Sequence, residues 1–224
     1  MYFTPTGGAV LPEPSRAMRE FATASKGHFT GQLTVGIGSG QLIHLESHLE
    51  MQAALVLVMR KEFVEIEEQV AFEWWGEDGN PRTHYFDFRV TSKVGTRAAI
   101  AVKPSRRLNK KNFLAEMVLI AGQMTSSFAD DVRVVTEQHL DPVDLYNAEL
   151  LYGVRAADVE ADQAAEKAVS SLLGAVSLEQ LTQSIGLGAR GFRALLRLIA
   201  AQRVLPALGE RITKNTLIYP ARAN

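Results

Sequence analysis

HLESHLE at residues 44–50, YFDFRV at 85–90 and IAVKP at 100–104 are the stretches that decide the predicted fold of this chain. From His44, apolar residues recur at three- and four-residue spacing to about Lys61, which predicts an amphipathic helix. The other two lie in runs rich in β-branched and aromatic residues, which predict strands. The chain is therefore expected to place a helix before a set of strands.

Turn signals such as GEDGNP and SKVGT separate the strand-like runs, and a second helical pattern follows them. The predicted elements are strands at 63–74, 84–91 and 97–103, a helix at 112–126 and a strand at 132–136. This order favours the α/β class, with a mixed sheet and helices on its faces.

The last third of the chain has a different pattern, with a capped short helix, a Gly-containing turn, an amphipathic helix and two short strands. That order is typical of a winged helix, with residues 190–202 in the recognition-helix position. The predicted divisions are an N-terminal arm at 1–40, a first domain at 41–140, a linker helix at 141–155 and a winged-helix domain at 156–224.

Composition restricts the function classes. The formal charge of the 224 residues is −1, so any contact with DNA must come from local basic patches. The sequence has no cysteine, which excludes disulfides and thiolate metal sites. It shows neither a secretory signal nor an apolar run of the ~20 residues that span a bilayer. We therefore expect a cytoplasmic protein without membrane contact.

Acidic and basic residues in the first domain form a candidate site. Glu50 is predicted on the first helix, Asp87 on one strand, and Lys103 at the end of the next. Mg²⁺ prefers hard oxygen ligands and keeps several waters, so two carboxylates and the main-chain oxygen of Val102 would suffice to hold it. Lys103 would then orient the attacking water. Glu46, expected on the same helix face as Glu50, is the alternative helix ligand.

Four blocks of sequence resemble those of TnsA-type endonuclease subunits of heteromeric transposases. ESHLE (46–50), EEQVAF (67–72), HYFDF (84–88) and AVKP (101–104) are similar to the ESxLE, EQP, HxPDF and EVKP blocks of that family. The resemblance covers roughly residues 15–220.

The resemblance implies a restriction-endonuclease-like PD-(D/E)xK nuclease domain followed by a winged-helix domain. It implies a Mg²⁺-dependent hydrolase, with Mn²⁺ able to substitute, that nicks the 5′ ends of a transposon. The expected partners are transposon-end DNA, a DDE transposase of the TnsB kind and an AAA+ regulator of the TnsC kind. Carried over by position, the catalytic residues are Glu50, Asp87 and Lys103.

Two positions depart from the family pattern. Phe86 replaces the proline before the aspartate, and Ala101 replaces the acidic residue of EVKP. The alanine leaves fewer metal ligands. Two alternatives therefore stay open: a catalytically inactive DNA-binding or assembly subunit of the same fold, and a winged-helix transcription regulator.

Two basic groups are candidate DNA contacts. The run KPSRRLNKK lies beside the candidate site, and arginines project from the predicted recognition helix. The predicted DNA-binding residues are Arg106, Arg107, Lys110, Lys111, Arg190, Arg193, Arg197 and Lys214. Winged helices also dock proteins, so a protein-binding role of the second domain is the alternative.

Overall fold

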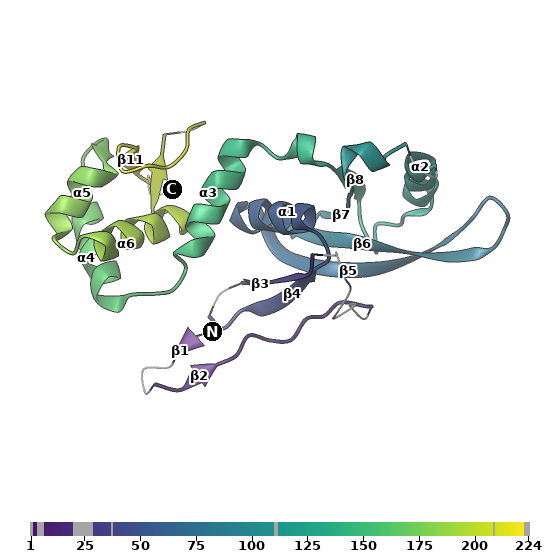
Figure 1. The fold of residues 1–224 in the computed structure, drawn as a ribbon, viewed down its shortest axis with the longest axis horizontal. Coiled ribbons are helices and arrows are strands. Elements are labelled where there is room, and N and C mark those ends of the chain that lie inside the picture. Colours follow the sequence, from purple (N-terminus) through teal and green to yellow (C-terminus); the bar gives the residue numbers. More distant parts are fainter. Residues whose placement is uncertain are drawn as a thin grey trace. The chain divides into compact units, whose positions relative to one another are not determined.

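The computed structural model describes residues 2–3, 7–19, 29–36, 38–109, 112–207 and 209–221. The chain divides into two compact units, Met1–Leu140 and Asp141–Asn224 (Figure 1). Among the described residues, no helix is long and apolar enough to cross a membrane.

The first unit is built on a four-stranded mixed sheet in the order β5-β6-β7-β8. The strands are β5 (Phe63–Trp75), β6 (Pro81–Ser92), β7 (Arg97–Val102) and β8 (Asp131–Val135). β5, β6 and β7 pair antiparallel, and β8 pairs parallel with β7. The parallel pair requires a crossover, which contains a helix. The α/β class predicted from the sequence is confirmed.

Two helices flank this sheet: α1 (His48–Met59) and α2 (Phe113–Gln123). Ile100 of β7 lines a cavity together with residues of α1, whereas its neighbours Ala99 and Ala101 pack in an apolar cluster with residues of α2. Successive side chains of a strand point to opposite faces. The helices therefore cover opposite faces of β7.

Smaller elements complete the first unit. They are β1 (Tyr2–Phe3), β2 (Ala9–Val10), β3 (Gly31–Val35), β4 (Gln41–Leu45) and the 3₁₀ turns η1 (Ser105–Arg107) and η2 (Glu137–His139). β3 and β4 form an antiparallel hairpin directly before α1.

The start of α1 corrects the sequence prediction. The helix was expected from His44, but residues 41–45 form β4, and α1 begins only at His48. The Ser47 side chain accepts from the Glu50 backbone N–H and caps the helix, which fixes its first turn. Glu46 thus precedes the helix, and the expectation that it shares a helix face with Glu50 is wrong.

The second unit contains four helices and a small antiparallel sheet of order β10-β11-β9 among the described residues. Its elements are α3 (Pro142–Gly153), α4 (Val159–Ser170), β9 (Val176–Ser177), α5 (Leu178–Ile185), α6 (Ala189–Ala200), β10 (Val204–Pro206) and β11 (Leu217–Pro220). The segment predicted as a linker helix is α3 and belongs to this unit. Fully buried Leu178, Leu195 and Ile218 come from three elements of one apolar core.

A glycine in α6 permits close packing against α5 and supplies a test of this core. A Cβ built on Gly191 would lie 2.9 Å from Cγ2 of Ile185, too close for a real contact, whereas one on Gly122 of α2 meets nothing within 4 Å. Gly191→Ala should lower the free energy of unfolding by about 1–2 kcal/mol, because the core is overpacked. Gly122→Ala should raise it by about 0.5–1 kcal/mol through helix propensity. Urea denaturation of both variants measures the free energy of unfolding. Equal changes in the two variants would contradict the close packing of α6 against α5 at Gly191.

Candidate functional site

Asp87 lies where β6 and β7 stop pairing. The ladder between the two strands runs from Thr91↔Arg97 to Phe88↔Ile100 and ends there. Beyond it, the backbone N–H of Val102 donates to Oδ2 of Asp87 at 2.6 Å. The carboxylate thus replaces a strand carbonyl as acceptor, which holds Asp87 at a fixed position between the two strands.

Gln69 of β5 lies opposite Asp87 and supports it. The neighbours Glu68 and Val70 pair with Phe88 and Phe86, but Gln69 has a φ of 49°, a left-handed conformation uncommon outside glycine. The Gln69 side chain is buried, and its Nε2 donates to Oδ1 of Asp87 at 3.3 Å. Such backbone strain persists where surrounding contacts enforce it and is concentrated at functional sites.

Sequence reasoning did not identify Gln69 as a member of the site. The only signal was a polar amide inside EEQVAF, within an otherwise regular strand pattern. No periodicity predicts a left-handed residue at this position.

Glu50 is positioned by the cap of α1. The residue is 7% exposed, and its carboxylate accepts from Ser47 Oγ at 2.7 Å and from the backbone N–H of Glu46 at 2.8 Å. These hydrogen bonds to the residues just before α1 hold the Glu50 side chain in the interior rather than on the solvent-exposed face of the helix. The same residue therefore contributes to helix capping and to the acidic site.

The electrostatics show that Glu50 and Asp87 interact. Burial, and then the negative charge of Glu50, raise the pKa of Asp87 to about 7, against the opposing effects of the Val102 N–H, Lys103 and Gln69. Burial also raises the pKa of Glu50 above its usual range. The charge of Glu50 thus disfavours the ionisation of Asp87, and two carboxylates placed in this way attract a proton or a cation.

Lys103 supplies a positive charge to this pair. It follows β7, and its backbone N–H donates to the Val135 carbonyl at 2.9 Å, which continues the parallel ladder by one bond. The ammonium lies 4.9 Å from the centroid of the Phe113 ring at the start of α2. Its charge lowers the pKa of both Asp87 and His84. The structure therefore brings Glu50, Asp87 and Lys103 together.

Ala101 is buried in the apolar cluster beneath α2. The residue is 3% exposed, and it belongs to the cluster that contains Phe86, Phe113 and Met117. A carboxylate at this position would enter apolar surroundings, where an unpaired charge is strongly disfavoured. The surroundings of Ala101 therefore favour an apolar residue at this position.

The donor set fits a hard divalent cation. Glu50 and Asp87 offer carboxylate oxygens whose repulsion a cation would relieve, and Val102, whose backbone N–H donates to Asp87, would supply the main-chain oxygen. Within the described part of the chain, no group of three or more Asp, Glu, His or Cys side chains is arranged to hold a metal. A metal here would therefore have two side-chain ligands, with the main chain and water completing its shell.

The basic run beside the site is only partly described. Arg106 and Arg107 form η1 and are exposed, while Lys110 and Lys111 lie outside the described residues. η1 is bonded to η2 through Glu137. The Glu137 carboxylate accepts from the Ser105 backbone N–H at 2.9 Å and from the Ser105 hydroxyl. The two arginines thus follow Lys103 in the sequence by only a few residues and are exposed to solvent.

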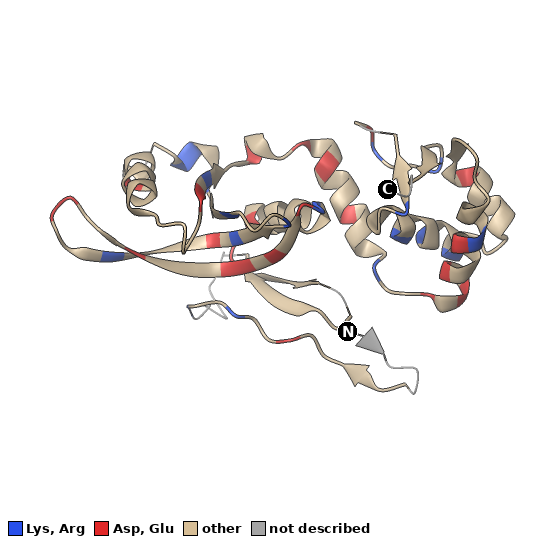
Figure 2. Ribbon diagram, turned by 180° about the vertical axis from the view of Figure 1, so that it is seen from behind, with Lys and Arg blue, Asp and Glu red and all other residues tan. Residues whose placement is uncertain are grey.

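Most predicted DNA contacts of the second unit are engaged in ion pairs. The pairs are Arg190 with Asp158 and Glu160, Arg197 with Asp162, and Lys214 with Glu179. Figure 2 shows basic and acidic segments interspersed over this unit. Arg193 is exposed and has no ion pair among the described residues. The net positive charge that α6 offers to a ligand is therefore smaller than its sequence indicates.

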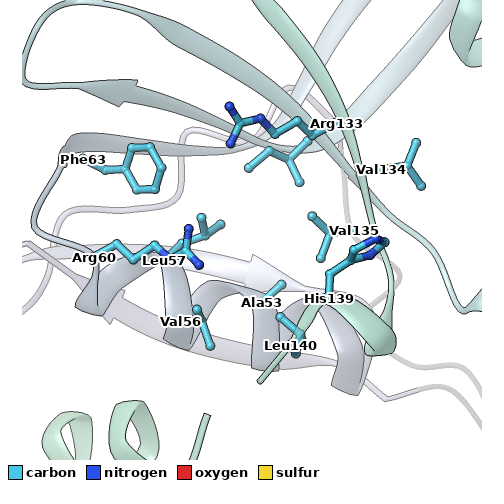
Figure 3. A pocket seen from close by; sticks show the side chains of 11 residues that line it. Ala53, Val56, Leu57, Arg60, Phe63, Arg133, Val134, Val135, His139 and Leu140 are labelled. Atoms are coloured by element: carbon cyan, nitrogen blue, oxygen red, sulfur yellow. The ribbon is translucent and has the colours of Figure 1, made fainter. Parts of the chain in front are cut away.

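A cavity of about 360 Å³ lies elsewhere in the first unit, beside α1, β7, β8 and η2 (Figure 3). It is lined by Ala53, Val56, Leu57, Arg60, Phe63, Ile100, Arg133, Val134, Val135, His139 and Leu140. Its lining is mainly apolar and includes none of Glu50, Asp87 and Lys103. The acidic site is therefore distinct from this cavity.

No family model matches the chain, and no curated protein matches it.

The raised pKa of Asp87 predicts a pH-dependent stability of the metal-free protein. A carboxyl whose pKa rises from an ordinary value of about 3.9 to about 7 on folding favours the folded state fully below pH 4. That contribution is lost as the pH rises through 7. Asp87→Asn should therefore raise the melting temperature by about 5–10 °C at pH 8 and much less at pH 5.

Thermal melts of both proteins at the two pH values test this prediction. Asp78→Asn is the control, because the pKa of the exposed Asp78 is lowered by its hydrogen bonds to Asn80 and Arg82. That substitution should give no gain at pH 8. An Asp87→Asn shift that is equal at both pH values would contradict the buried, coupled pair.

Proposed function

We propose that the chain is a divalent-metal-dependent DNA endonuclease and that it nicks the 5′ ends of a transposon as one subunit of a cut-and-paste transposase. One observation carries the proposal: at the point where two strands separate, the buried carboxylate of Asp87 interacts electrostatically with the buried Glu50 and with Lys103. Perturbed titratable groups of this kind are concentrated at catalytic sites.

Each residue of the site would have a separate role in phosphodiester hydrolysis. Glu50, Asp87 and the Val102 carbonyl would hold Mg²⁺, which supplies charge neutralisation and an activated water when bound. Gln69 and the Val102 N–H keep the Asp87 carboxylate in place. Lys103 orients the attacking water and stabilises negative charge on the phosphate.

The architecture supports a finer assignment of both units. A mixed sheet whose central strands separate at an acidic residue, flanked by α1 and α2, is compatible with a restriction-endonuclease-like nuclease domain. In the second unit, the order α4, β9, α5, α6, β10, β11 with a β10-β11-β9 sheet is compatible with a winged helix. We infer these two folds from element order and pairing.

The partners follow from the resemblance of the four sequence blocks to TnsA-type subunits. We propose transposon-end DNA as the substrate, a DDE transposase that joins the 3′ ends, and an AAA+ regulator. Exposed Arg106 and Arg107 would contact DNA phosphates beside the site. The intramolecular ion pairs of α6 favour a protein-docking role for the second unit over direct readout of bases.

One observation favours a second candidate, a catalytically silent DNA-binding or assembly subunit. The Ala101 side chain is committed to the apolar cluster, so it leaves the site with two carboxylates rather than three. The two candidates differ in whether the wild-type chain cleaves DNA.

A supercoiled-plasmid nicking assay with Mg²⁺ or Mn²⁺, with and without a partner transposase, separates these candidates. The proposed function predicts metal-dependent conversion to nicked circles that Asp87→Ala eliminates. An absence of nicking under all conditions, or equal nicking by wild type and Asp87→Ala, would reject the endonuclease and leave the silent subunit.

A further inference from the structure

The N-terminal segment 13–19 runs beside β4 and β5 and reaches the candidate site. Glu13 exchanges backbone hydrogen bonds of 2.8 Å with Gly40 and Leu42. Farther along, the Ser15 hydroxyl donates to Oε1 of the buried Glu68 at 2.5 Å. These contacts fix the segment along the edge of β4 and above β5.

The end of this segment lies against the site itself. The Met18 backbone N–H donates at 3.2 Å to the carbonyl of Gln69, the residue that supports Asp87. Arg19 then forms an ion pair with Glu46, and its guanidinium carbon lies 5.6 Å from the centroid of the Tyr85 ring. The Arg19 guanidinium is thus positioned by its ion pair with Glu46 and by the nearby ring of Tyr85.

The Arg19 charge acts on the acidic pair from the Glu50 side. It lowers the pKa of Glu50, whereas Lys103 lowers that of Asp87. Two cations from distant parts of the sequence therefore flank two carboxylates. Lys103 offsets part of the negative charge that a phosphate group must approach, whereas the effect of Arg19 is opposed by the carboxylate of Glu46, which raises the pKa of Glu50.

Arg19 retains capacity for a ligand. Its side chain is 36% exposed, and only one of its nitrogens is paired with Glu46. Its Nε is buried and has no hydrogen-bond partner among the described residues, so only the terminal nitrogens can reach a ligand. A guanidinium has five N–H donors in a planar fork that matches phosphate oxygens.

Glu46 is engaged with Arg19 rather than with Asp87. Its carboxylate pairs with the guanidinium, and its contact with Glu50 is through the backbone N–H. A carboxylate that holds an arginine in one orientation pre-organises that arginine for an anionic ligand.

We propose that Arg19 is a substrate-binding residue that holds a DNA phosphate beside the Glu50–Asp87 site, and that Glu46 is its positioning residue and not a metal ligand. This inference rests on the proposed function, because it names a further contact between the same site and its substrate. It assigns distinct roles to the two glutamates that the sequence left as alternatives.

Fluorescence anisotropy with a labelled duplex oligonucleotide in Ca²⁺, over a series of salt concentrations, measures the proposed contact. Arg19→Gln should weaken DNA binding about five- to tenfold and reduce the salt slope by about 1. Glu46→Gln should weaken it about two- to fourfold, and the double variant should match Arg19→Gln, since the two residues act as one unit. Arg16→Gln removes the same charge from an exposed position of the same segment and should leave the affinity within about twofold of wild type.

A Mn²⁺ titration followed by electron paramagnetic resonance provides the second readout. Glu46→Gln should change the Mn²⁺ affinity less than about threefold, whereas Glu50→Gln should lower it at least about tenfold.

Each contrary result has a distinct meaning. Equal DNA affinities and salt slopes for Arg19→Gln and Arg16→Gln would overturn the role of Arg19. Loss of Mn²⁺ binding in Glu46→Gln would make Glu46 a metal ligand and overturn its positioning role. If the wild-type protein nicks plasmid while Arg19→Gln binds DNA normally, the inference fails and the endonuclease stands. If the wild type neither binds nor nicks DNA, both fail.

Discussion

Asp87→Asn is expected to reduce the rate of DNA nicking by about a thousandfold or more, since it removes a carboxylate from the metal site while preserving the size of the side chain. Asparagine retains an oxygen that accepts from the Val102 N–H, so the separation of β6 and β7 should be kept. The loss should therefore arise from chemistry and not from unfolding.

Initial rates on supercoiled plasmid with Mn²⁺ measure the loss. Asp130→Asn is not a suitable control, because Asp130 accepts from the Arg97 backbone at 2.8 Å. Exposed Asp78, in the turn after β5, is the better match, and Asp78→Asn should nick at the wild-type rate. Residual activity of Asp87→Asn within about tenfold of wild type would remove Asp87 from the metal site.

Lys103→Met should have the second largest effect, a loss of about 10²–10⁴ in nicking rate with little change in stability. Methionine keeps an unbranched apolar chain beside the Phe113 ring and removes the charge that acts on Asp87. Because the ammonium is no metal ligand, Mn²⁺ should still bind.

Lys93→Met is the matched control, because Lys93 is exposed in the turn between β6 and β7. Rates should be compared at equal occupancy by Mn²⁺. If Lys103→Met nicks as fast as Lys93→Met, Lys103 has a structural role only.

Much of the first unit was predictable from the sequence. The strand patterns around Phe72, Phe88 and Ile100 and the intervening turns correspond to β5, β6 and β7. Period-two alternation and Gly-containing turns are local properties, so a single sequence carries them. The start of α1 was missed because residues 41–45 pair with β3, and this tertiary pairing overrides the apolar periodicity.

The sequence was sufficient to predict which charged residues form the site, but not which residues they contact. The left-handed backbone of Gln69 and the ion pair between Arg19 and Glu46 depend on residues distant in sequence. The same holds for Arg190, whose charge is engaged by Asp158, the N-cap residue of α4. Local pattern identifies a charged residue, whereas only the folded chain determines whether its charge is free.

The most direct test of the central proposal is the binding of Mn²⁺ to the purified protein at pH 8, followed by electron paramagnetic resonance of the free ion. The Glu50–Asp87 site predicts saturable binding of a single Mn²⁺ per chain, weakened at least about tenfold by Asp87→Asn and by Glu50→Gln. Binding should be retained by Lys103→Met. Absence of saturable binding in the wild type, or equal affinity in wild type and Asp87→Asn, would contradict a metal-dependent nuclease at this site.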